Sequence, residues 1–248
     1  MALTTVVVIT ARMGSERFPG KSLAPLAGRP VLDWVAARCA EAGYPVWLAL
    51  PATKDNDGLA AVAAAWGTVR RPDVAETDVL GRVAAVLSEA NADIFVRVTG
   101  DCPMADPALL QEAVRCLEPG RIAYASNTVP GFRTFARGLD VEAMDVGLVS
   151  AAYQKATKGY DREHVTPWIQ RYVKSRRLGM TVTQARTGED GWQWSVDTPD
   201  DLAWLNRMAA VYMQHTGQPT LPPAQWLREY LHTHPDDVRH DTRLTLVR

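Results

Sequence analysis

The sequence predicts an α/β protein with a mostly parallel, mixed sheet that helices cover on both faces. In the first half, short β-branched runs, which are typical of buried strands, alternate with apolar residues at helical spacing. Glycine and proline occupy the connections, and the chain shows no internal repeat, low-complexity tract or linker. These observations favour a Rossmann-like, three-layer arrangement in which strands and helices follow one another along the chain.

Clear local signals define the elements of the first half. The run Val6–Ile9 predicts a buried strand, and Gly43 ends the helix that follows a loop rich in glycine and proline. Asp106 and Pro107 form an N-cap followed by proline at the first helical position. We expect further strands at residues 46–50, 94–98, 122–125 and 139–144, and helices at residues 31–42, 59–66, 79–87 and 107–117.

The second half carries weaker signals. Strands are expected at residues 178–183 and 192–196, and a capping box at residues 198–201 begins a helix that reaches Tyr212. A proline-rich stretch leads to one more short helix within residues 218–230. We expect a single domain over residues 1–231, followed over residues 232–248 by a polar tail that is partly disordered.

Composition restricts the classes of partner. The 248 residues include 27 basic and 28 acidic side chains, a formal net charge of -1, so we expect no nucleic-acid partner. The three cysteines lack C-x-x-C spacing and predict neither a disulfide framework nor a zinc site. The first ten residues have no basic leader and are too short to span a membrane. We therefore expect a cytoplasmic protein with no membrane partner.

The loop after the first strand is rich in glycine and in cations. Residues 10–22 read TARMGSERFPGKS and leave the end of the strand at which open α/β sheets bind ligands. Gly14 and Gly20 allow close backbone approach, and the loop carries three cations, Arg12, Arg17 and Lys21. Because backbone amides and fixed cations neutralise phosphate charge, the loop predicts a triphosphate site.

Two other interpretations of this loop fit less well. Gly20-Lys21-Ser22 matches the end of the G-x-x-x-x-G-K-[ST] phosphate loop. However, Ser15 stands where that motif needs its first glycine, and Gly14 comes one position too early. The other alternative is a surface loop whose basic residues have no shared role. The position of residues 10–22 directly after a buried strand argues against this alternative.

Two aspartates follow predicted strands. Asp101 comes just after the strand at residues 94–98, and Asp197 just after the one at residues 192–196. Both are expected at the sheet edge that carries the basic loop, where two carboxylates facing a triphosphate suit Mg²⁺. The alternative is structural, because Asp197 precedes a helix cap and Asp101 begins a turn.

An ordered set of segments resembles the cytidylyltransferases that make CMP-activated sugar acids. That family includes the 3-deoxy-manno-octulosonate and acylneuraminate enzymes, and the similarity is greatest to the branch of the spore-coat polysaccharide synthesis F protein. It extends from about residue 5 to about residue 215. The matching segments are Ala11–Lys21, Asp78–Arg82, Arg97–Pro103, Gly138–Glu142, Asp161–Pro167 and Val196–Leu202.

The resemblance implies a glycosyltransferase-A-like nucleotide-diphospho-sugar transferase fold, a homodimer and specific residue roles. Asp101 and Asp197 would bind Mg²⁺, and Asp78 and Arg82 would lie near the nucleoside. The phosphates of CTP would be held by the loop residues Ala11, Arg12, Met13, Gly14, Ser15, Arg17 and Lys21. The acceptor side or the dimer contact would use Asp140, Glu142, Arg162, Glu163 and His164. Arg137 departs from the family pattern and adds a cation there, and guanidinium groups such as those of Arg137 and Arg162 match an acceptor anion.

The expected activity is therefore Mg²⁺-dependent transfer of CMP from CTP to a small acidic acceptor. A sugar acid is the first choice of acceptor, and a phosphonate or phosphorylated metabolite is the second. Arg12, Lys21, Asp101 and Asp197 form the expected catalytic set. The alternatives are a nucleotide-sugar-dependent glycosyltransferase, although Asp101-Cys102-Pro103 lacks the second aspartate of a D-x-D motif, and a non-catalytic nucleotide-binding protein.

Several conspicuous residues have plainer interpretations. His164 has a suitable pKa for a general base, but a structural or substrate-contact role is the first expectation. Trp192 and Trp194 alternate on a predicted strand and are expected in packing, as is Cys102. We expect no metal site in the polar tail, although its acidic and histidine residues are close in sequence; these are His232, His234, Asp236, His240 and Asp241.

Overall fold

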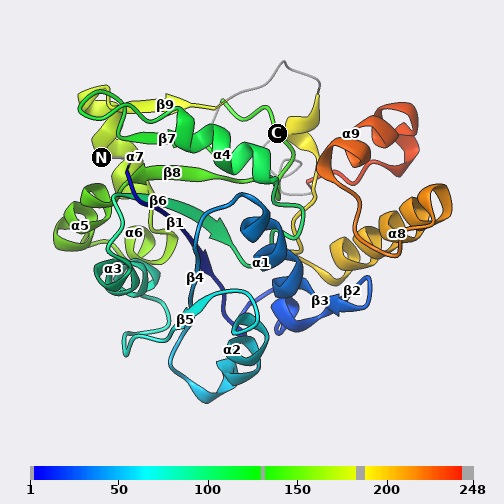
Figure 1. Cartoon of the computed structure of the whole chain (residues 1–248), viewed down its shortest axis with the longest axis horizontal. Coiled ribbons are helices and arrows are strands. Elements are labelled where there is room, and N and C mark those ends of the chain that lie inside the picture. The colour runs from blue at the N-terminus through cyan, green and yellow to red at the C-terminus, as the bar shows by residue number, and fades with distance from the viewer. Residues whose placement is uncertain (1–2, 130–131, 183–187, 242–248) are drawn as a thin grey trace.

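The computed structural model, which describes residues 3–129, 132–182 and 188–241, contains a seven-stranded mixed sheet (Figure 1). The strand order is β5-β4-β1-β6-β8-β7-β9. Strands β5, β4, β1 and β6 are parallel, β8 runs antiparallel to β6 and β7, and β9 is parallel to β7. The strands are β1 (Thr5–Thr10), β4 (Val46–Ala49), β5 (Thr68–Arg70), β6 (Ile94–Thr99), β7 (Tyr124–Ser126), β8 (Glu142–Asp145) and β9 (Gly179–Thr181). The predicted α/β class and mostly parallel, mixed sheet are confirmed.

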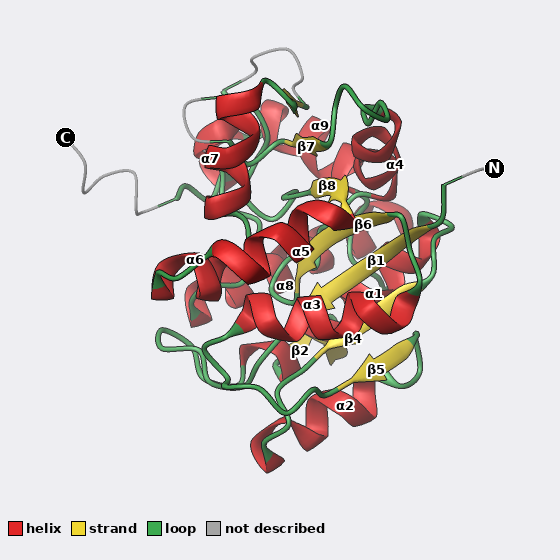
Figure 2. Cartoon of the chain, turned by 90° about the vertical axis from the view of Figure 1, so that its left-hand side faces the viewer, coloured by secondary structure: helices red, strands yellow, loops and turns green. Residues whose placement is uncertain are grey.

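Helices cover both faces of this sheet and bury a separate apolar cluster on each. One cluster contains residues of α1, α2, α4, α8 and α9, and the other contains residues of α3, α5 and α7. Figure 2 shows α3, α5 and α6 across this second face. The helices are α1 (Val31–Glu41), α2 (Asp57–Ala63), α3 (Val79–Ala90), α4 (Pro107–Arg115), α5 (Val146–Lys155), α6 (Gly159–His164), α7 (Pro167–Arg176), α8 (Pro199–Thr216) and α9 (Ala224–Thr233). None of these described helices has the length and apolar character that crossing a bilayer requires.

The alternation of side chains along β6 determines what reaches the functional edge of the sheet. Val96 and Val98 pack in the cluster of α1, whereas Phe95 packs in the cluster of α3. Because successive side chains of a strand point to opposite faces, Arg97 and Thr99 share the face of Phe95. The strand therefore presents two polar side chains on the α3 face, close to its carboxyl end.

The segment at residues 192–196 is not the sheet strand that we predicted. It makes only isolated bridges, between Gln193 and Arg137 and between Trp192 and His240. Trp192 and Trp194 are both buried in the α1-side cluster, which agrees with a packing role. The alternating tryptophans therefore mark a buried segment that does not pair with a neighbouring strand along its length. The strand predicted at residues 178–183 is shorter, and residue 183 lies outside the described residues.

Residues 232–241 are not the unsupported polar tail that we expected. Helix α9 continues to Thr233, a 3₁₀ turn covers Pro235–Asp237, and Arg239 and Asp241 make backbone hydrogen bonds to Gln193 and Gly191. Residues 242–248 lie outside the described residues. The segments α5, α6, α7 and β5 were also not predicted.

Candidate active site

A cavity of about 530 Å³ opens at the carboxyl ends of β1 and β6, a size typical of small-molecule sites. The residues that line it are Thr10, Ala11, Arg12, Ser15, Glu16, Arg17, Lys21, Ser22, Val79, Arg82, Arg97, Thr99, Gly100, Asp101, Glu163, His164 and Asp197. The structure thus brings together ten of the residues that the sequence nominated, from five separate parts of the chain.

The basic loop is held in place by hydrogen bonds around Met13. The Met13 amide donates to Asn56 Oδ1 at 2.9 Å, and the amides of Ser15 and Gly20 donate to the Met13 carbonyl. Gly20 has a φ of 76°, in the left-handed region that favours glycine. The loop continues into a 3₁₀ turn and the short hairpin of β2 (Pro25–Leu26) and β3 (Arg29–Pro30). A standard P-loop leads directly into a long helix, and this loop does not.

Lys21 lies between the two aspartates that the sequence singled out. Its Nζ donates to Asp101 Oδ2 at 2.6 Å and lies 3.4 Å from Asp197 Oδ1, which Arg17 Nη2 also approaches at 2.9 Å. Burial opposes the charge of Lys21, but Asp101 and then Asp197 outweigh it and raise the pKa of Lys21. Burial likewise acts to raise the pKa of Asp101, but the charge and hydrogen bond of Lys21 lower it. Asp101 is therefore held ionised beside this cation, and Asp197 approaches the same cation.

Close backbone approach brings the two loops at this edge together. A Cβ on Gly100 would lie 2.6 Å from Ala11 Cβ and 3.3 Å from the Thr10 carbonyl oxygen. Only glycine fits such an approach without movement of the backbone. The Val196 amide also donates to the Asp101 carbonyl at 2.8 Å, which joins the segments that carry the two aspartates.

Helices α3 and α6 form the opposite wall. Asp78 caps α3 by accepting from the Gly81 amide at 2.9 Å, and Arg82, one turn further on, is only 1% exposed. Burial lowers the pKa of Arg82. From α6, Glu163 pairs with Arg12 at 2.8 Å, and His164 lines the cavity. The loop and α6 are thus joined by an ion pair across the cavity.

Seven nominated residues do not line the cavity. Asp78 and Arg162 form an ion pair with each other, and Asp140 pairs with Arg133 at 2.6 Å. Glu142 is buried and pairs with Arg97 at 2.6 Å. The others are Met13, Gly14 and Arg137.

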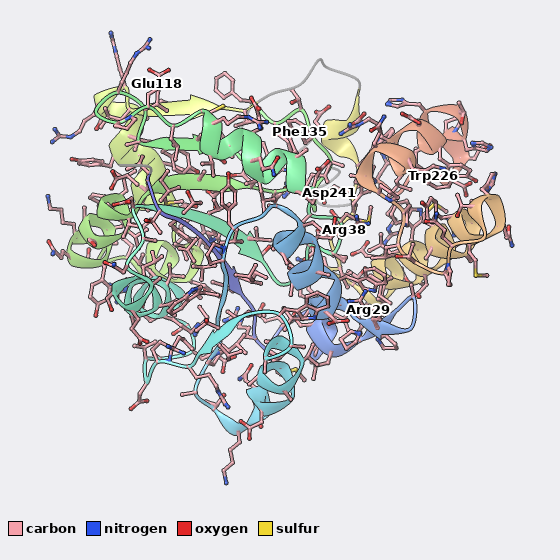
Figure 3. All side chains as sticks on the ribbon, viewed as in Figure 1. Arg29, Arg38, Glu118, Phe135, Trp226 and Asp241 are labelled. Atoms are coloured by element: carbon pink, nitrogen blue, oxygen red, sulfur yellow. The ribbon has the colours of Figure 1, made fainter. Side chains whose placement is uncertain are left out.

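Arg137 is engaged elsewhere in the fold. Its guanidinium pairs with Asp241, which Figure 3 labels, and its amide bonds to the Trp192 carbonyl. Arg137 and Arg162 do not line this cavity, so their contact with an acceptor anion stays a prediction. Each guanidinium is used instead in an ion pair with a protein carboxylate.

Arg97 and Thr99 are the most important residues that sequence reasoning missed. Arg97 lies in the cavity lining at the middle of β6, and Thr99 Oγ1 donates to Asp101 Oδ1 at 2.7 Å. A charged residue within the apolar run IFVRVT was the available signal, because a strand covered on both faces is otherwise apolar. The other missed lining residues are Thr10, Glu16, Ser22, Val79 and Gly100.

Cys102 and His232 both lie in packed surroundings. Burial raises the pKa of the Cys102 thiol well above its usual range, so it is a packed thiol and not an activated nucleophile. His232 lies 3.0 Å from the buried Glu189 and packs against the ring of Trp192. No cluster of three or more acidic, histidine or cysteine side chains suited to a metal occurs within the described ranges.

Comparison with known proteins identifies the family. A sequence model of the cytidylyltransferase family matches residues 6–218. The 3-deoxy-manno-octulosonate cytidylyltransferase of Geobacter metallireducens is 39% identical over 238 residues, with 79% of this chain and 93% of that protein covered. The protein of the same name from Trichlorobacter lovleyi is 37% identical over 240 residues, with 79% and 95% covered.

Solved structures agree at the level of the fold. A cytidylyltransferase from Leptospira borgpetersenii superposes with a TM-score of 0.84 at 24% identity and covers 97% of this chain and 99% of its own. A CMP:2-keto-3-deoxy-manno-octonic acid synthetase complexed with CTP gives 0.62 at 21% identity, with 84% and 99% covered. With the family match over most of the chain, these similarities show that the protein belongs to the cytidylyltransferase family of nucleotidyltransferases.

Proposed function

We propose that this chain transfers CMP from CTP to the anomeric hydroxyl of a small sugar acid and releases pyrophosphate. The observation that carries the proposal is the convergence of Lys21 with Asp101 and Asp197 beside a glycine-containing basic loop. The names of relatives that are 37–39% identical, 3-deoxy-manno-octulosonate cytidylyltransferases, support a sugar acid as the acceptor.

The proposed reaction is an in-line displacement at the α-phosphorus of CTP. A bond forms between the acceptor oxygen and the α-phosphorus, the bond to the bridging oxygen of pyrophosphate breaks, and the hydroxyl proton passes to water. Such transfers depend mainly on positioning and charge stabilisation. Arg12, Arg17 and Lys21, which all line the cavity, would neutralise the β- and γ-phosphates as charge builds on the leaving group.

Asp101 and Asp197 fit a magnesium ion. Carboxylate oxygens are ligands that Mg²⁺ prefers, and the ion commonly keeps waters and substrate phosphates in its shell. The two carboxylates already converge on one cation, the Lys21 ammonium group, at 2.6 and 3.4 Å. When bound, Mg²⁺ would supply Lewis-acid neutralisation of phosphate charge. Lys21, whose side chain approaches both carboxylates, would then be available to the leaving phosphates.

The test is pyrophosphate release in the presence of Mg²⁺. CTP, UTP, ATP and GTP are each paired with 3-deoxy-manno-octulosonate, an acylneuraminate and a small phosphonate. Release with CTP and a sugar acid alone is the expected result. Release only with the phosphonate would change the acceptor class, and release of a nucleoside diphosphate from a nucleotide-sugar would indicate a glycosyltransferase instead. CTP binding without any release would indicate a non-catalytic protein. The homodimer implied by the resemblance is tested separately by light scattering, which gives the molar mass of the protein in solution.

A further inference from the structure

Arg97 is a guanidinium in the cavity with hydrogen-bonding capacity left over. Its side chain is 17% exposed, and Nη1 donates to Glu142 Oε2 at 2.6 Å. Its Nε is buried and has no hydrogen-bond partner among the described residues. A guanidinium carries five N–H donors, and one carboxylate contact uses only part of them.

The Glu142 carboxylate, by contrast, is fully hydrogen-bonded. It is 3% exposed, and besides Arg97 it accepts from Tyr124 Oη at 2.5 Å, Gln170 Nε2 at 3.3 Å and Thr128 Oγ1 at 3.4 Å. Tyr124 Oη also accepts from Gln170 Nε2 at 3.1 Å. A buried ion pair kept only for stability is expected to satisfy both partners, because leftover buried donors cost free energy. Here the carboxylate is fully bonded and the arginine is not.

The position of Arg97 separates it from the phosphate loop. The three loop cations follow β1, whereas Arg97 comes from the floor of the cavity, on β6, and is braced by Glu142 of the neighbouring strand β8. Tyr124 of β7 and Gln170 of α7 hold Glu142 from behind. The network thus presents a fixed cation on the side of β6 that faces away from β1.

We propose that Arg97 binds the carboxylate of the acceptor and selects acidic over neutral acceptors, with Glu142 as its positioning residue. This inference rests on the proposed function and deepens it. A guanidinium fork matches a carboxylate in geometry and charge. Charge-assisted hydrogen bonds of this kind correspond to about 10- to 100-fold in binding.

The experiment compares Arg97→Gln/Glu142→Gln with Glu142→Gln alone. The double substitution leaves no unpaired charge in the network, and the single one keeps Arg97. For each protein, KM is measured for CTP, for 3-deoxy-manno-octulosonate and for its carboxamide. The wild type is expected to prefer the acid, by kcat/KM, by about 10- to 100-fold. The double variant is expected to lose this preference at an unchanged KM for CTP. Glu142→Gln keeps the cation but weakens the contact that positions it, so this variant is expected to lose only part of the preference.

The outcomes separate this inference from the proposed function. Arg121→Met, at an exposed arginine paired with Glu118, is the control and should match the wild type. If the wild type uses the acid and the double variant keeps the full preference for it, the role of Arg97 is overturned and the proposed function stands. A higher KM for CTP with an unchanged acceptor KM would assign Arg97 to the nucleotide and also overturn it. Failure of the wild type to use any carboxylate acceptor would overturn both proposals.

Discussion

Asp101 and Asp197 meet at one cation, yet the protein supports them in different ways. Asp101 is held locally, because it follows β6 in a tight turn and accepts from Thr99 Oγ1 at 2.7 Å, two residues earlier. Asp197 follows a segment that is not paired as a regular strand, and it accepts from Gln193 Nε2 at 3.1 Å. Its amide donates to Asp201, the third helical residue of α8, at 3.1 Å.

The support of Asp197 extends into the last described residues. Arg239 Nε donates to Asp201 Oδ1 at 3.0 Å, and the Arg239 carbonyl accepts from the Gln193 amide at 2.8 Å. One residue of the C-terminal segment therefore contacts two residues that position Asp197. The family match ends at residue 218, so this support comes from a part of the chain beyond it. The difference teaches that two carboxylates that meet at one cation can depend on sequence neighbours or on distant segments.

The largest effect is expected at the carboxylates themselves. Asp101→Asn and Asp197→Asn should each lower kcat by about 100-fold or more, because a bound metal supplies several kcal/mol of charge stabilisation. Steady-state pyrophosphate release at saturating CTP measures this. If both variants kept near-normal turnover, the comparison would lose its basis, because neither aspartate would bind the metal.

A smaller effect should distinguish the distant support from the local one. Arg239→Met is expected to lower kcat by about 10-fold and to raise the Mg²⁺ concentration needed for half-maximal activity, as loss of an outer partner of a metal ligand commonly does. Arg239→Lys should restore part of the activity. Arg207→Met is the matched control, since Arg207 is 57% exposed and only approaches Asp237 at 3.7 Å.

Thr99→Val tests the local support in the same assay. Its effect should be smaller than that of Arg239→Met, because Asp101 keeps its turn and its contact with Lys21. A loss of only a few-fold is expected, because one hydrogen bond typically contributes about 0.5–1.5 kcal/mol. A larger loss in Thr99→Val than in Arg239→Met would reverse the comparison.

The smallest effect concerns stability and pH. Lys21 lowers the pKa of Asp101, so in the wild type this carboxyl stabilises the fold above its ordinary pKa of 3.8 and stops doing so as the pH falls. In Lys21→Met, burial is expected to raise the pKa of Asp101 instead, so the variant should lose stability as the pH rises. Urea unfolding from about pH 4 to about pH 7 should show a widening gap that reaches about 1.5–3 kcal/mol. A gap that does not change with pH would contradict this.

Much of the site could be predicted because its signals are local. The three cations of the loop, Asp101 and Asp197 all lie just after buried segments, and all five line one cavity. The structure of residues 232–241 was predicted poorly because this segment lacks such local signals. Its polar composition predicts no element, whereas its contacts with Gln193, Asp201 and Arg137 depend on where α8 and α9 place it.

The sequence by itself determined the α/β class, the strand ends and the cations beside them. Periodicity and capping are properties of neighbouring residues, so they can be read without knowing the fold. Only the tertiary structure decided the pairing of Arg97 with Glu142, 45 residues away, and of Arg137 with Asp241. Sheet order places β8 beside β6, and packing of the last segment places Asp241 beside Arg137. Such partners carry no local signal, because the choice of a distant partner is a result of packing.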